Sequence, residues 1–213
     1  MRVKFWLKSA LQNSLIIVGG GLLYVALLMA MEPMDSIQDV FQVASIYLLA
    51  MGAMLSILLE MSVFKVNLPL AIGCGSTRKE AFLGRQLYRA VFTALLTVTV
   101  IGLAALAGDK GMAPLDVYTP IVLAVMLVTG SVGSVLGAFS TKLGKTGLVI
   151  LGLIMGVIAV LMIVAGFIGG AALADTANWS RWMVWLAPVA AAVVYGLSII
   201  PEHKTIYKYN VKQ

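Results

Sequence analysis

Residues 68–89, LPLAIGCGSTRKEAFLGRQLYR, are the one sizeable charged segment between long apolar runs in a chain of 213 residues that is 61% hydrophobic. The charge is basic: Lys65 precedes the segment, and Arg78, Lys79, Arg85 and Arg89 lie within it. Loops on the cytoplasmic side of a membrane carry the excess of Lys and Arg. We therefore expect residues 65–89 to form a cytoplasmic loop between membrane-spanning helices.

The apolar runs around this segment set the fold class. Only 11% of the residues are charged, whereas a soluble domain carries about 25%. A bilayer core about 30 Å thick needs spans of roughly 20 apolar residues. The runs of suitable length are 11–31, 40–64, 90–107, 118–139, 147–173 and 182–200. The sequence therefore predicts an all-α integral membrane protein with six transmembrane helices, in which residues 1–213 are a single transmembrane domain.

The distribution of basic residues predicts the orientation of these spans. If the N-terminus is cytoplasmic, then 13 of the 15 Lys and Arg residues fall on the cytoplasmic side, and only Lys110 and Arg181 fall outside. We therefore expect both termini in the cytoplasm, including an interfacial N-terminal segment, 1–12, and a polar tail, 201–213. Anionic lipid at that membrane face accounts for the net charge of +6 without any nucleic-acid partner.

The N-terminal segment has two interpretations. Lys4 and Lys8 lie four residues apart, and Phe5 and Trp6 between them can enter the lipid boundary. Such a pattern suits a short helix lying on the membrane surface. It equally suits a basic flank of the first span.

Few residues are candidates for chemistry. Cys74 and His203 are each the only residue of their type, and we expect an inert loop thiol and a solvated tail imidazole. The sequence Gly144-Lys145-Thr146 resembles the end of a phosphate-binding loop, but Phe139 stands where that loop requires glycine. We therefore expect no metal, cofactor or nucleotide site in this chain.

The spans themselves have little polar character. Glu60 is the one candidate for a charge inside the membrane, and we expect it at the boundary, paired with Lys65 or with the N-terminal segment. An ion-coupled transporter usually has buried polar groups near the midplane. The sequence therefore favours a protein without its own energy source.

Glycine spacing predicts close helix contacts. Gly133 and Gly137 are four apart in one span, and Gly152 and Gly156 are four apart in the next. Small residues at this spacing let helix backbones approach each other. We favour packing within the chain, and an interface with a second subunit is the alternative.

The charged segment carries a local helix signal. Thr77 and Glu80 match a capping box, in which each side chain satisfies the other's backbone N–H. Gly73 and Gly75 allow a sharp turn before it. We therefore predict a short helix over residues 78–83.

This short helix could hold a soluble protein below the membrane. Phe82 gives it an apolar side, Arg78, Lys79 and Arg85 give it cationic contacts, and Gly84 allows a bend after it. The alternative is a solvated charged loop that only sets topology.

The six spans and this loop together resemble the membrane subunits of ABC-2-type ABC exporters, whose transmembrane domain is of the type V exporter kind. The residues that carry the resemblance are Gly75, Thr77, Arg78, Lys79, Phe82 and Gly84. The resemblance implies that the loop is a coupling helix that docks on a separate ATPase subunit through Thr77, Arg78, Lys79, Glu80 and Phe82. The chain departs from larger family members because only residues 166–181 are available for re-entrant outer helices.

The resemblance also implies a function. It predicts a permease subunit in a bacterial cytoplasmic membrane that pairs with a second membrane subunit and with ATPase subunits, which supply ATP and Mg²⁺. The substrate would be amphipathic or hydrophobic, such as an antimicrobial peptide, a lipid or a drug. The alternative is a six-span scaffold or sensor that holds a cytoplasmic regulator without transport. An intramembrane enzyme is disfavoured because the spans contain no catalytic constellation.

Overall fold

The computed structural model describes residues 2–31, 36–108, 114–141 and 184–208. These residues form helices and the turns between them, and they contain no strand. The helices are α1 (Arg2–Met31), α2 (Ile37–Lys65), α3 (Asn67–Gly73), α4 (Arg78–Ala107), α5 (Leu115–Ser140) and α8 (Leu186–Lys208).

Five stretches in the described residues are long and apolar enough to cross a membrane. They are Val3–Leu27, Ile37–Gly73, Arg78–Ala107, Leu115–Ser140 and Leu186–Lys208. These stretches correspond to five of the six expected spans and indicate a multi-pass membrane protein. The remaining expected span, 147–173, lies outside the described residues.

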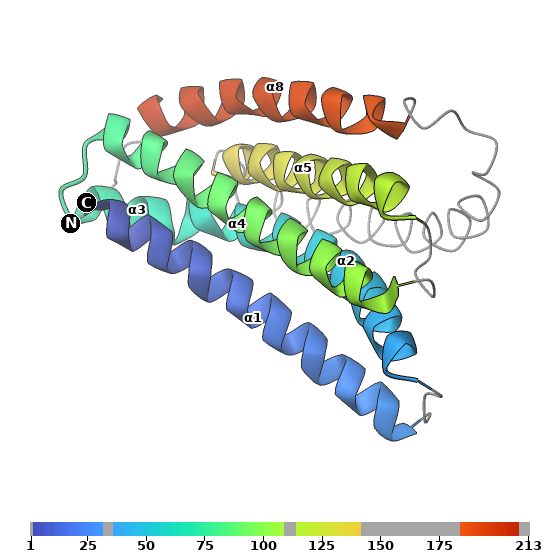
Figure 1. Ribbon diagram of the computed structural model, residues 1–213. Helices are drawn as coiled ribbons and strands as arrows, with labels where there is room; N and C mark the ends of the chain where they lie inside the picture. The colour runs from blue at the N-terminus through green and yellow to red at the C-terminus, as the bar shows by residue number, and fades with distance from the viewer. Residues whose placement is uncertain (1, 32–35, 109–113, 142–183, 209–213) are drawn as a thin grey trace.

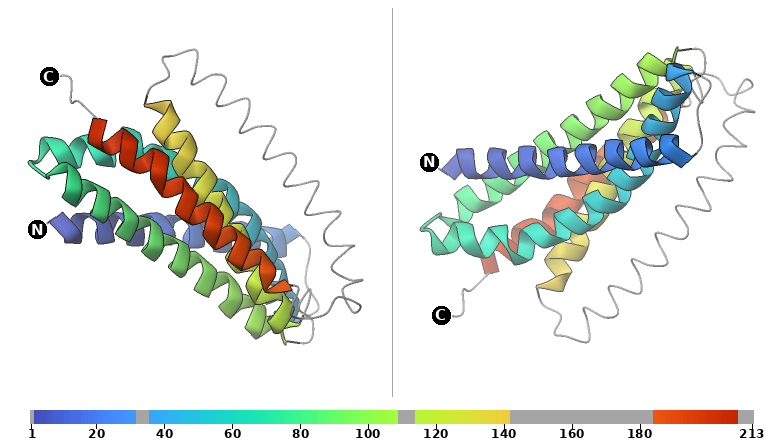
Figure 2. Two further views of the ribbon diagram at one scale, coloured as in Figure 1. Left: turned by 90° about the horizontal axis from the view of Figure 1, so that it is seen from above. Right: turned by 90° about the horizontal axis from the view of Figure 1, so that it is seen from below.

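The long helices pack as a bundle (Figure 1). α5 lies between α2 and α8, and α1 packs against α2 and α4. The N-terminus, the turn between α3 and α4, and the last turns of α8 lie at the same end of the bundle, as both views of Figure 2 show. We refer to this as the turn end.

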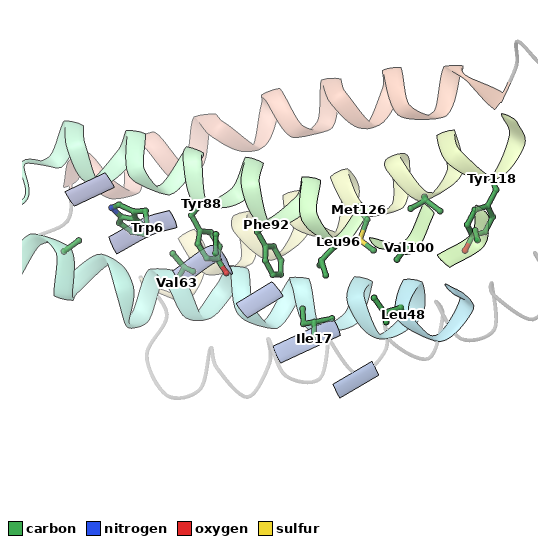
Figure 3. Packing of buried hydrophobic residues seen from close by; sticks show 14 residues of the cluster. Trp6, Ile17, Leu48, Val63, Tyr88, Phe92, Leu96, Val100, Tyr118 and Met126 are labelled. Atoms are coloured by element: carbon green, nitrogen blue, oxygen red, sulfur yellow. The ribbon is translucent and has the colours of Figure 1, made fainter. Parts of the chain in front are cut away.

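The core is apolar and is shared mainly by α1, α2, α4 and α5 (Figure 3). Tyr88, Phe92 and Leu96 succeed one another at four-residue spacing along α4, so that one face of the helix carries the central contacts. Tyr88 and Phe92 stack with their ring centroids 5.6 Å apart. Asn13 on α1 donates to the Tyr88 hydroxyl over 2.8 Å, which fixes α1 in register against α4.

The turn between α3 and α4 is closed at both ends by local hydrogen bonds. At the end of α3, Ser76 N donates to Ala71 O over 3.0 Å and Gly75 N donates to Ile72 O over 2.9 Å. This is a Schellman motif, and Gly75 supplies the positive φ, 82°, that it requires. Thr77 then begins α4 with the predicted capping box, whose two reciprocal bonds to Glu80 are both present.

The expected short helix over 78–83 is wrong in its length. α4 continues without a break from Arg78 to Ala107. α4 continues through Gly84 as one helix, and a Cβ at this position would overlap the Trp6 ring, so the missing side chain makes room for α1. The segment 65–89, expected as one loop, is thus helical except for Val66 and the turn 74–77.

The two ends of the chain are also more helical than expected. α1 runs unbroken from Arg2, and Trp6 is buried in the bundle at 1% exposure instead of facing lipid. α8 continues past Pro201 to Lys208. Glu202, Thr205 and Ile206 are buried on one side of this extension. Packing against the bundle therefore stabilises a helix in a segment whose polar composition predicted a solvated tail.

Candidate functional site

The residues predicted to dock a partner begin α4 at the turn end. Thr77, Arg78, Lys79 and Glu80 are exposed. Thr77 N donates to Glu80 Oε2 over 2.8 Å, and Glu80 N donates to Thr77 Oγ1 over 3.2 Å, so the start of the helix is capped. The guanidinium of Arg78 donates through Nη1 to the backbone carbonyl of Tyr207 on α8, over 2.9 Å.

Phe82 differs from these four residues because it is half-buried within the chain. It packs against a small apolar cluster of Phe64, Leu68, Ala81, Ala138 and Ile206. Its ring also meets His203 of α8 edge-on, with centroids 5.2 Å apart, and His203 stacks on Tyr207 at 4.2 Å. His203, expected on a solvated tail, is therefore a helical residue with two aromatic neighbours.

Below this turn lies a set of buried charges that we call the charge cluster: Glu60 on α2, Arg85 and Arg89 on α4, and Glu202 on α8. All four side chains are fully buried. They form two ion pairs, Arg85 with Glu60 and Arg89 with Glu202. Two positive and two negative charges face one another, so the cluster is electrically balanced.

Arg89 is the more extensively bound of the two arginines. Its Nη1 donates to Glu202 Oε1 over 2.9 Å and to Ser198 Oγ over 2.7 Å, and its Nη2 donates to Ser131 Oγ over 2.6 Å. The guanidinium also lies 3.7 Å from the ring centroid of Tyr195. Because Ser131 belongs to α5, this one side chain connects α4 with both α5 and α8.

The other contacts extend the cluster to α2 and strengthen its hold on α8. The Arg85 guanidinium pairs with Glu60 and lies 4.9 Å from the centroid of the Phe64 ring, which is also on α2. Gln86 donates to Glu202 Oε2 over 2.6 Å. Both oxygens of Glu202 therefore have a donor from α4.

The cluster corrects two expectations. Glu60 does not pair with Lys65 or with the N-terminal segment, because its partner is Arg85. The expectation that the helices lack buried ionisable groups is also wrong. Burying a charge within a membrane helix costs free energy, so such charges usually mark functional positions. The alternative is that paired charges only hold helices together.

Sequence reasoning placed Arg85 and Arg89 in a solvated loop. One signal could have corrected this. Arg85, Arg89, Thr93 and Thr97 recur every four residues, which places them on a single helical face, and all four are buried. The carboxylate partners carry no local signal, since Glu60 and Glu202 are 25 and 113 positions away from the arginines they meet.

Two of the glycines singled out for packing lie where α5 meets α2. A Cβ on Gly133 would lie 2.7 Å from the backbone of Ile57, and one on Gly137 would lie 2.5 Å from Phe64 Cδ2. These glycines therefore serve close packing within the chain. Gly152 and Gly156 lie outside the described residues.

Groups that could support other chemistry are sparse in the described part of the chain. It holds no group of three or more His, Cys, Asp or Glu residues that could bind a metal ion. Cys74 is an exposed free thiol in the turn between α3 and α4. The arrangement that stands out is thus an exposed basic turn joined by α4 to a buried charge cluster.

No family model, no curated protein and no solved structure matches this chain.

Proposed function

We propose that this chain is the permease subunit of an ATP-driven exporter, of the kind that the ABC-2 membrane subunits represent. It would pair with a second membrane subunit in a bacterial cytoplasmic membrane and move an amphipathic or hydrophobic substrate. Separate ATPase subunits would bind ATP and Mg²⁺ and dock at the α3–α4 turn through Thr77, Arg78, Lys79 and Glu80.

The observation that carries this proposal is the continuity between the turn and the charge cluster. α4 begins at the capped turn, and Arg85 and Arg89 follow on the same unbroken helix, about 10 and 16 Å from its start at 1.5 Å per residue. The two arginines hold α2, α5 and α8. A force applied by a partner at the turn would therefore reach four helices as a rigid-body displacement.

The charge cluster bears on the energy source as well. Each carboxylate of the cluster faces a guanidinium, so these groups serve first to hold helices together. In the described part of the chain, the buried carboxylates Glu60 and Glu202 are both paired, so neither is free to bind a coupling ion, which suits a transporter driven by an external source of energy. A partner that hydrolyses ATP supplies it.

The second candidate is a scaffold or sensor that holds a cytoplasmic regulator without transport. The feature that favours it is the same cluster, since paired buried charges that join four helices also suit a static bundle. The two functions differ in the partner: a permease binds an ATPase, whereas a scaffold binds a protein that has no need to bind ATP.

The test is purification of the chain from native membranes, followed by photolabelling of the co-purified proteins with azido-ATP. We expect an ATP-labelled partner, ATP hydrolysis by the complex and none by the isolated chain. Lys79→Glu should release this partner, while Lys8→Glu, an equal charge change on α1, should retain it. A retained partner that binds no ATP would favour the scaffold, and ATP hydrolysis by the isolated chain would contradict both functions.

A further inference from the structure

We propose that the last two turns of α8 and the start of α4 form a single docking surface, which binds an acidic face of the ATPase subunit. We call it the composite surface. Its residues are Arg78, Lys79, His203, Lys204, Tyr207 and Lys208. The inference rests on the proposed function, because it adds a second element to the same docking site.

Direct contacts join the two elements. Arg78 donates to the carbonyl of Tyr207, and Phe82 meets His203 edge-on. One turn deeper, Gln86 donates to Glu202. Side chains of the last turns of α8 therefore contact each of the first three turns of α4. A partner that contacts the exposed turn also reaches α8.

Contacts with α4 hold the part of α8 that follows Pro201. Proline has no backbone N–H, so one hydrogen bond of α8 is missing where the last two turns begin. Beyond Pro201, the buried residues Glu202 and Ile206 face the bundle, and Glu202 is held by donors from α4. The segment is thus fastened to α4 as well as to its own helix, so the two should move together.

The charge of the composite surface defines the partner. Arg78, Lys79, Lys204 and Lys208 are all exposed. The two acidic residues nearby are already engaged, since Glu80 caps α4 and Glu202 is buried against Arg89. The surface therefore presents cations around the exposed rings of His203 and Tyr207, which suits an acidic protein face.

The chain offers a matched control for this surface. Lys4 and Lys8 on α1 are exposed, four residues apart and at the same turn end, just as Lys204 and Lys208 are on α8. Reversing either pair changes the net charge of the chain by the same amount. Only the α8 pair belongs to the composite surface.

The experiment measures how tightly the ATP-labelled partner is held by the full chain in phosphatidylcholine nanodiscs, at increasing salt. Four forms are compared: wild type, Lys79→Glu, Lys204→Glu with Lys208→Glu, and Lys4→Glu with Lys8→Glu. We expect the α8 pair to weaken binding by about tenfold or more, with a reduced salt dependence of what remains. The α1 pair should bind as wild type does.

Three results would overturn the inference. If Lys79→Glu releases the partner and the α8 pair does not, then α8 is not part of the site, although the proposed function stands. If the α1 pair weakens binding as much as the α8 pair, the effect is one of general charge. If the α8 pair keeps the partner but loses binding to phosphatidylglycerol vesicles, the surface is a lipid site. Absence of any ATP-labelled partner on wild type would instead refute the proposed function.

Discussion

Replacing Arg85 with methionine would leave Glu60 in its buried position on α2 without the guanidinium that balances its charge. Both side chains are fully buried, so the structure around Glu60 gives its carboxylate no contact with bulk solvent. Breaking a buried ion pair by removing one partner destabilises a protein by about 3–5 kcal/mol. For a chain of this length, such a loss corresponds to a fall in melting temperature on the order of 10 °C.

The double variant Glu60→Met with Arg85→Met separates the ion pair from packing. Apolar residues of similar volume often replace a buried pair at no loss of stability, so the double variant should recover most or all of the wild-type value. The control is Lys65→Met, which removes an exposed cation from the end of the same helix and should change stability by no more than about 0.5 kcal/mol.

The assay is unfolding of the purified chain in detergent micelles, by heat and by titration with dodecyl sulfate, followed by circular dichroism. With the single variant Glu60→Met measured as well, the wild type, the two single variants and the double variant form a double-mutant cycle. If the unfolding free energy of Arg85→Met lies within about 1 kcal/mol of the wild-type value, the loss is well below that of breaking a buried pair. The ion pair would then be accessible to water, and the cluster would not hold α2 to α4. A double variant no more stable than the single one would show that packing, not charge, carries the effect.

Three further outcomes follow from the structure. Gly84→Ala should destabilise the chain by about 1–3 kcal/mol and shift its tryptophan fluorescence, because the new Cβ overlaps the Trp6 ring. The control is Gly102→Ala on the same helix, which has open space around it and should not destabilise the chain. Gly133→Ala should destabilise similarly through Ile57, whereas Gly196→Ala should not; equal effects of the two would argue against close packing of α5 on α2. Cys74, exposed in the turn, should react with a membrane-impermeant maleimide in inverted vesicles and not in intact cells; the reverse pattern would refute the cytoplasmic orientation of the turn.

The features that the sequence predicts well are local ones. The capping box of Thr77 and Glu80 and the turn at Gly75 depend on residues within five positions of each other, and both are found. The apolar runs predict the long helices for the same reason, since their signal lies within each helix.

The features it does not predict depend on remote partners. Arg85 and Arg89 have the composition of a loop, and only Glu60 and Glu202 on other helices make their burial possible. α8 passes Pro201 because Glu202 and Ile206 find buried positions in the bundle. Gly84 is a helix breaker by propensity, and its place in α4 is explained only by Trp6, 78 residues earlier in the chain.

The most direct test of the central proposal is a photo-crosslinking amino acid placed at position Lys79 and activated in native membranes. Lys79 is exposed at the start of α4, so a partner docked at the turn lies within reach. The proposal predicts a crosslink to a protein that binds azido-ATP, and no such crosslink from the same amino acid placed at Lys8 on α1. Crosslinks from position 79 that lead only to lipid, or to a protein that binds no ATP, would contradict it.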